Sequence, residues 1–246
     1  MADSRLSKSL LNSYQVGNLM IEAAADHSFA LTRLLVEPVP TVAPWTCARG
    51  ALEASALSCW LLAADVSSRE RVARGFAYRH STLREQQKLA RSTKDQSALD
   101  RIAARIDEVE GKALALGFNR VVDKNDRRIG IGRVMPSTTD LVGDVCRQET
   151  LYRIFSAMAH SQSTAMVRLG FLPFDASLPT VLTKSMNSDV AAVLLTSGAD
   201  SLAHPVWAKA RLFGLDCERL VKIFEARYGE MGLAESKYFW RHEASS

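Results

Sequence analysis

Apolar residues recur every three or four positions along most of the chain, a spacing typical of amphipathic helices. Over residues 4–36 this spacing predicts one long helix, or two helices that break near Gly17. A proline-rich connector follows at 37–44, and Pro44 fits the first turn of the next helix. That helix, WTCARGALEASALSCWLLAAD, is apolar on nearly all sides, so we expect it to lie at the centre of the core.

Capping residues mark the ends of the next two predicted helices. Ser67 and Glu70 form a capping box that opens a helix reaching about Arg91. A second helix spans about 96–116 and ends at Gly117, a residue suited to a C-terminal cap.

Residues 118–135 change character, because β-branched residues flank the polar pair Asn125 and Asp126. This pattern predicts a small β-hairpin or a mobile basic loop. Helix restarts after Pro136, with Thr138 as a possible N-cap.

The rest of the chain is predicted as helices separated by a proline-containing loop. One helix covers 147–170, and a loop then passes through Pro173 and Pro179. Two further helices cover about 188–197 and 205–228.

These elements predict an all-α fold, a helical bundle with a short β-hairpin or loop insertion near 118–135. We expect a single helical domain over 1–246. Its core bundle would span about 44–229, with the N-terminal helix 4–36 packed on it.

Composition and charge narrow the function classes only slightly. The 246 residues are 47% apolar and 24% charged, as in ordinary globular proteins. The net charge of +4 permits nucleic-acid binding without requiring it. No CxxC pair occurs, which argues against a zinc knuckle. Cys47 and Cys59 lie in apolar helical runs, as buried small hydrophobic residues do, and we expect a reducing compartment without disulfides. The four scattered cysteines are Cys47, Cys59, Cys146 and Cys217.

The sequence predicts a cytoplasmic protein without a membrane segment. Asp3 stands early in the N-terminal stretch, and no apolar signal core follows it. The most apolar run, 54–64, is shorter than the roughly 20 residues that cross a bilayer. No HExxH, P-loop or dinucleotide motif occurs, so we expect no cofactor and no metal site.

A polar strip runs along the predicted helix RQETLYRIFSAMAHSQSTAMVRLG. Helical geometry places its members within about 60° of one another, with Tyr152 at the edge; they are Glu149, Arg153, Ser156 and His160. In a functional interpretation Arg153 holds a phosphate and His160 transfers protons, while Ser156 and Tyr152 position the substrate or the imidazole. RNA suits this pair because its own 2′-hydroxyl is the nucleophile. The alternative is an internal hydrogen-bond network in which Glu149 and Arg153 form an ion pair.

The segment RIFSAMAH places six residues between an arginine and a histidine, and it resembles the R-x(4–6)-H signature of HEPN-type helical domains. The wider pattern YRIFSAMAHS, preceded by RGALEASALSCWLL, is similar to HEPN-like bacterial proteins over about 45–170. The resemblance implies a helical bundle and a homodimer. In catalytic members it implies a metal-independent ribonuclease site, here Arg153 and His160, in proteins that act as toxins or in phage defence.

Two further features have more than one interpretation. Arg49 and Glu53 lie four residues apart on one face of the apolar helix. Glu53 would orient His160 or Arg153, or would form a buried structural ion pair with Arg49. The helix that opens at Ser67 carries a basic face that would follow a nucleic-acid backbone or simply be solvated; this face is Arg84, Lys88 and Arg91.

We therefore expect an HEPN-like domain that binds or cleaves RNA. The sequence leaves two alternatives open. One is a catalytically silent helical module for interaction or regulation, and the other is a helical protein that binds a small molecule.

Overall fold

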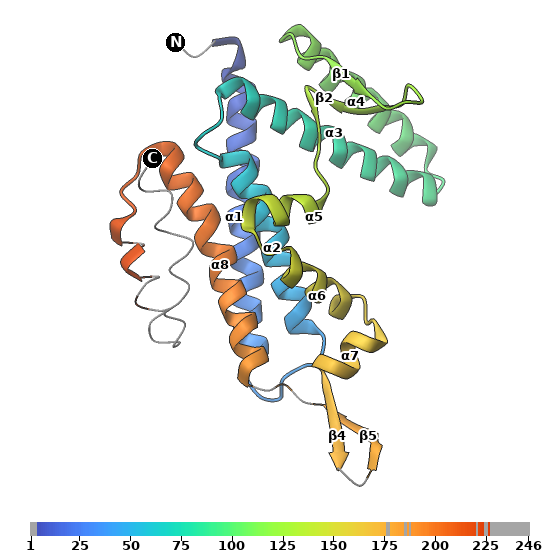
Figure 1. The fold of residues 1–246 in the computed structure, drawn as a ribbon. Helices are drawn as coiled ribbons and strands as arrows, with labels where there is room; N and C mark the ends of the chain where they lie inside the picture. Colours follow the sequence, from blue (N-terminus) through green and yellow to red (C-terminus); the bar gives the residue numbers. More distant parts are fainter. Residues whose placement is uncertain are drawn as a thin grey trace. The chain divides into compact units, whose positions relative to one another are not determined.

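The computed structural model describes residues 4–175, 178–184, 186, 188–219, 221–223 and 226. Most of these residues are helical, and the strands are short (Figure 1). The predicted all-α helical bundle with a small hairpin near 118–135 is thus confirmed.

The described residues fall into two compact units. Unit 1 lies within Met1–Ala23 and Glu53–Glu149, and unit 2 lies within Ala24–Leu52 and Thr150–Ser246. The single domain expected over the whole chain stays a prediction.

The helices and strands have the following bounds. The helical segments are η1 (Ser4–Leu6, a 3-10 turn), α1 (Ser7–Leu34), α2 (Ala43–Leu62), α3 (Ser68–Ser92), α4 (Gln96–Ala115), α5 (Thr138–Leu141), η2 (Val142–Cys146, a π-helical turn), α6 (Glu149–Ala159), α7 (Ser163–Leu169) and α8 (Ser188–Phe213). The strands are β1 (Arg120–Val122), β2 (Arg128–Ile131), β3 (Arg133–Val134), β4 (Phe171–Asp175) and β5 (Leu178–Lys184). β1, β2 and β3 form one antiparallel sheet, and β4 and β5 form another.

In unit 1, α3 and α4 pack side by side, and β2 lies against α3 (Figure 1). Phe76 of α3 and Phe118, just after α4, meet edge to face with ring centroids 5.7 Å apart. The buried apolar cluster around them comprises Leu6, Leu10, Val72, Ala73, Leu83, Ile106, Val109, Ala113 and Ile131.

Local signals explain the ends of the helices in unit 1. The Ser67 hydroxyl accepts a hydrogen bond from the Glu70 amide at 3.1 Å and begins α3, as predicted. Gly117 follows α4 with φ +76°, which confirms the predicted C-terminal cap. The N-cap of α5 is Ser137 rather than Thr138, because the Ser137 hydroxyl accepts from the backbone of the first turn.

The arginines in the first half of α3 serve the structure of unit 1. Arg69 donates to the carbonyl of Gly117 at 2.7 Å, and the buried Arg71 donates to the carbonyl of Leu61 at 2.9 Å. Arg74 donates to the carbonyl of Trp60 at 2.6 Å. Carbonyls at helix C-termini lack intrahelical donors, so these three side chains satisfy the ends of α2 and α4.

In unit 2, α8 packs against the part of α1 that follows Ala23. The Ser28 hydroxyl donates to the carbonyl of Gly198 at 3.0 Å. A Cβ at Gly198 would lie 3.0 Å from the Leu31 side chain, so the glycine allows this close approach. Trp45 of α2 and Phe155 of α6 meet edge to face with centroids 6.0 Å apart.

The prediction of one continuous helix over 147–170 is wrong. The structure has two helices there, α6 and α7, because the chain turns at Ser161 with a positive φ of 53°.

The predictions after Gly170 also need correction. The loop expected through Pro173 and Pro179 is the antiparallel hairpin β4–β5. The two helices expected over 188–197 and 205–228 are one helix, α8, which continues through Pro205 and ends at Phe213. Part of the range expected to be helical beyond that point lies outside the described residues.

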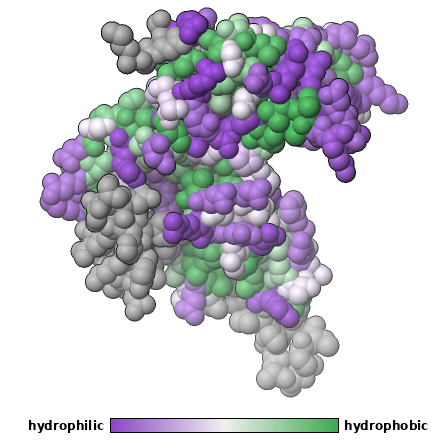
Figure 2. Space-filling model, turned by 45° about the horizontal axis from the view of Figure 1, so that its top comes forward, coloured by the Kyte–Doolittle hydropathy of each residue, from purple (hydrophilic) through white to green (hydrophobic). Residues whose placement is uncertain are grey.

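Hydrophilic residues cover much of the face in Figure 2, with hydrophobic residues between them. Large apolar side chains exposed on α1 include Leu11, Leu19 and Phe29. Within the described ranges, no helix is both long enough and apolar enough to pass through a bilayer.

Candidate functional site

Three residues of the predicted polar strip on α6 are exposed, Glu149, Arg153 and His160, whereas Ser156 is half-buried. Tyr152, Phe155 and Met158 are buried and hold the helix on its other side. Arg153 and His160 are exposed. These two side chains therefore avoid the free-energy cost of burying a polar group without a partner.

The position of His160 is fixed by the C-terminal cap of α6. Its amide donates to the carbonyl of Ser156 at 2.9 Å, so the backbone stays in helical register one residue past the helix. Ser161 follows with φ +53°, and the amide of Gln162 reaches back to the carbonyl of Ala157 at 3.0 Å. This arrangement is a Schellman-type cap, which presents the imidazole at the helix end.

Arg49 of α2 connects two of the predicted site residues. Its Nη1 lies 3.0 Å from Nε2 of His160, and its guanidinium carbon lies 5.7 Å from the centroid of the Tyr152 ring. A guanidinium has donors and no acceptor. Nε2 is therefore the acceptor in this contact, and the neutral imidazole carries its proton on Nδ1.

Ser156 lies one helical turn before His160. Its hydroxyl oxygen is shielded from solvent and has no hydrogen-bond partner within the described ranges. Its predicted role in positioning the substrate or the imidazole stays a prediction.

The two predicted carboxylates belong to unit 1. Glu53 is half-buried in α2. Glu149, the first residue of α6, is exposed, and its carboxylate lies close to Gly143. Their assignment to the site stays a prediction.

The sequence offered Glu53 either as the residue that orients His160 or Arg153 or as the ion-pair partner of Arg49, and it did not indicate the contact between Arg49 and His160. Arg49 and His160 are 111 residues apart in the chain. Helical spacing predicts the face on which each residue lies, and it carries no signal for which helices meet.

Comparisons with known proteins add no further constraint on function. No family model, curated protein or solved structure matches this chain. Among the described residues, no group of three or more His, Cys, Asp and Glu side chains is arranged to hold a metal ion. The function is therefore inferred from the geometry of the site and from the R-x(6)-H segment.

Proposed function

We propose that this chain is an HEPN-like protein that binds RNA and cleaves it without a metal ion. Arg153 anchors a backbone phosphate, and His160 transfers a proton. Arg49 supplies a second guanidinium beside the imidazole, and Tyr152 positions that guanidinium. The spacing of Arg153 and His160 along α6 supports this assignment.

The observation that carries the proposal is the 3.0 Å contact between Arg49 Nη1 and His160 Nε2. It joins a permanent positive charge to a neutral imidazole, which is the form that acts as a general base. His160 and Arg153 are exposed and Arg49 is half-buried, so a phosphate in solvent has access to them. Guanidinium groups bind phosphate oxygens in a bidentate manner, so an RNA phosphate competes well for Arg49.

In the proposed reaction the 2′-oxygen of one nucleotide attacks the neighbouring phosphorus. Nε2 of His160 takes the proton of the 2′-hydroxyl, and the guanidinium groups of Arg49 and Arg153 stabilise the charge on the non-bridging oxygens. The bond between phosphorus and the 5′-oxygen breaks, and that oxygen takes a proton from water. His160 then returns its proton to solvent, and the products carry a 2′,3′-cyclic phosphate and a 5′-hydroxyl.

The proposal includes a homodimer, because the R-x(4–6)-H pairs of catalytic HEPN-type domains come together from paired helices. A role as a toxin or in phage defence follows from the same resemblance. RNA is the proposed partner in either role.

The test is cleavage of end-labelled single-stranded RNA by the purified chain in EDTA. We expect fragments that end in a cyclic phosphate. His160→Ala should lower the rate by about 10²- to 10⁴-fold, the usual share of a general base. Arg153→Ala should lower it by roughly tenfold or more, because a charge-assisted hydrogen bond to phosphate is lost.

Arg168→Ala is the matched control, since Arg168 is an exposed arginine of α7 outside the proposed site. It should leave the rate within about twofold of the unsubstituted chain, as expected for a surface change. Cleavage by His160→Ala at the full rate would contradict the proposal. A folded chain that leaves RNA intact would instead support the catalytically silent interaction module, and a co-purified metabolite would support a small-molecule-binding protein.

A further inference from the structure

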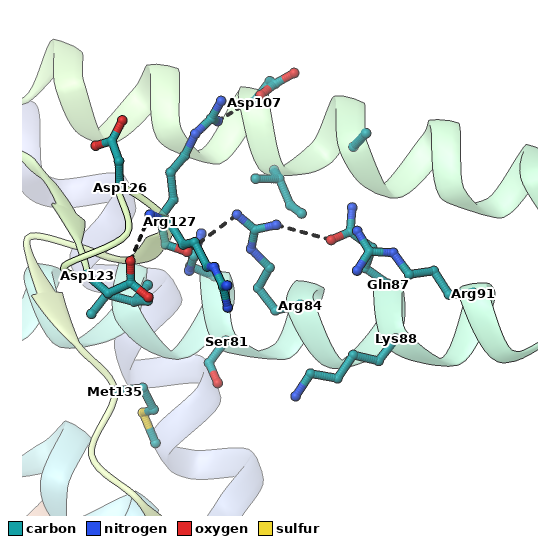
Figure 3. Close-up of a pocket in the computed structure, with 15 residues that line it drawn as sticks. Ser81, Arg84, Gln87, Lys88, Arg91, Asp107, Asp123, Asp126, Arg127 and Met135 are labelled. Carbon is teal, nitrogen blue, oxygen red and sulfur yellow. Dashed lines mark hydrogen bonds and ion pairs between the residues drawn. The ribbon is translucent and has the colours of Figure 1, made fainter.

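A cavity of about 720 Å³ opens in unit 1 between α3, α4 and the turn that joins β1 to β2 (Figure 3). This volume is in the range of sites that hold small organic molecules. The basic face of α3 that the sequence singled out forms one wall. The opposite wall comes from the turn, whose arginines the sequence did not connect with that face.

Cations from both walls meet at this cavity. They are Arg84, Lys88 and Arg91 from α3, with Arg127 from the turn and Arg128 from β2. In Figure 3 the side chains of Arg84, from α3, and Arg127, from the turn, lie near each other. Like charges that converge in this way repel each other unless an anion lies between them.

Acidic residues already neutralise part of this charge. Lys88 pairs with Glu85 at 2.7 Å and Arg128 pairs with the buried Glu110 at 2.9 Å, and Asp126 also lines the cavity. Asp123 accepts hydrogen bonds from the amides of Asn125 and Arg127 at 2.8 and 2.9 Å, so its carboxylate serves to hold the turn. Asp107 lies 3.5 Å from Arg128. Arg127, together with Arg91 on α3, has no ion pair with any residue that the structure describes.

One buried donor at the cavity lacks an acceptor within the described part of the chain. Nε of Arg84 is shielded from solvent and has no acceptor, although its Nη1 donates to Gln87 at 3.1 Å. His80 is 1% exposed and lines the cavity, and its Nε2 makes no hydrogen bond but faces Oε1 of Glu110 at 3.8 Å. A buried donor without an acceptor is unfavourable, and an oxyanion in the cavity would satisfy it.

We propose that this cavity binds a nucleotide through its phosphate. Arg84, Arg91 and Arg127 hold the phosphate oxygens, as guanidinium groups do at phosphate sites. A phosphate ion alone would fill only a small part of the volume, and the rest of the lining suits an apolar or planar body such as a base. That apolar lining comprises Ala103, Ile106, Ile129 and Met135.

The nucleotide is either free or part of an RNA strand, and the recognised chemistry is the same in both cases. The inference does not depend on the proposed ribonuclease reaction, because its residues belong to unit 1 and its readout is binding rather than cleavage.

Calorimetric titration of the full chain with ADP, and separately with a uridine octanucleotide, tests this inference. We expect saturable binding of at least one of these probes. Arg127→Gln and Arg91→Gln should each weaken that binding about tenfold, since each removes a charge-assisted hydrogen bond. Both side chains are exposed, so the thermal midpoint of unfolding should stay the same.

Lys124→Gln is the matched control, because Lys124 is exposed in the same turn and does not line the cavity. It removes one positive charge and should change the affinity less than about twofold. Binding of ADP identifies a free nucleotide as the ligand, and binding of the octanucleotide alone identifies a nucleotide within a strand.

Three results would overturn the inference. One is that neither probe binds, and another is that Lys124→Gln weakens binding as much as Arg127→Gln. The third is that binding of the octanucleotide is weakened by Arg153→Ala and not by Arg127→Gln, which would assign the RNA to the site on α6 alone. A failure of RNA cleavage leaves the ADP measurement unaffected, so the two proposals fail separately.

Discussion

Glu110 of α4 is a buried carboxylate held by two guanidinium groups. Its side chain is 1% exposed, and its Oε2 accepts from Arg120 at 2.7 Å and from Arg128 at 2.9 Å. Burial by itself would raise the pKa of this carboxyl, but the two hydrogen-bonded arginines outweigh burial and hold the pKa below its ordinary value. The carboxylate thereby ties the strands β1 and β2 to α4.

Replacing Glu110 by Gln should lower the free energy of unfolding by about 2 kcal/mol, because the buried carboxylate no longer accepts charge-assisted hydrogen bonds from the two arginines. Urea denaturation at pH 7 measures this change. Asp107→Asn is the control, since Asp107 also faces Arg128 but is 73% exposed; it should change stability by no more than about 0.5 kcal/mol. Equal effects of the two substitutions would contradict the structural role of Glu110.

His80 lies beside this carboxylate, with Nε2 3.8 Å from Oε1 of Glu110. Burial lowers the pKa of the imidazole, as do the charges of Arg84 and Arg128, and together these outweigh the opposing effect of Glu110. The unfolded chain, whose ordinary histidine pKa is 6.5, therefore takes up a proton before the folded chain does. Stability should fall as the pH drops below that value.

The pH prediction is tested by comparing His80→Gln with the unsubstituted chain between about pH 7 and pH 5.5, a window that includes the ordinary histidine pKa. The substitution should reduce the slope of unfolding free energy against pH, by up to about 1.4 kcal/mol per pH unit. Glu110 contributes stability above the ordinary glutamate value of 4.5, and this is lost as the pH falls through its lower folded pKa. Identical slopes for both proteins between pH 7 and 5.5 would refute the effect of His80.

At the scale of elements, the sequence predicted the helix ends that depend on a local signal. Ser67 and Gly117 are such signals, because a capping hydroxyl and a glycine act within one turn. The end of α6 was missed because its positive φ falls on Ser161, a residue that does not favour this conformation. At Pro205 the error was the reverse, because a helix start was predicted where none occurs. A proline usually ends or kinks a helix, but α8 continues through Pro205.

Ser161→Gly should raise the free energy of unfolding by roughly 0.5–1 kcal/mol, because glycine adopts positive φ without steric cost. Ala165→Gly, inside α7, is the matched control and should have the opposite sign, with a loss of about 0.5–1 kcal/mol. Chemical denaturation of the two variants gives both values. A destabilised Ser161→Gly variant would contradict the idea that positive φ at Ser161 costs stability.

At the scale of the whole molecule, helical periodicity predicted the all-α class, and the R-x(6)-H segment predicted Arg153 and His160 as site residues. Arg153 and His160 were predicted on one face of a helix, and α6 places them on an exposed face. The partner of His160 could not be predicted, because the contact with Arg49 depends on how α2 packs against α6. The convergence of Arg84 and Arg127 at the cavity in unit 1 depends on tertiary packing in the same way.

The proposed homodimer makes a prediction at this scale. Sedimentation equilibrium should give twice the 27.1 kDa mass of the chain at micromolar concentration. A mass of one chain under those conditions would remove the dimer from the proposal. It would leave the chemistry of Arg49, Arg153 and His160 to be tested on a monomer.

The most direct measurement follows the imidazole of His160 itself by nitrogen NMR during titration with a non-cleavable dinucleotide, 2′-deoxyuridylyl-(3′→5′)-adenosine. The two ring nitrogens of His160 should shift saturably, because the phosphate takes over the guanidinium of Arg49 that donates to Nε2. The ring signals of His27 serve as the internal reference and should stay in place. Ring signals of His160 that do not move while the dinucleotide is bound would contradict the proposal that this histidine acts on RNA.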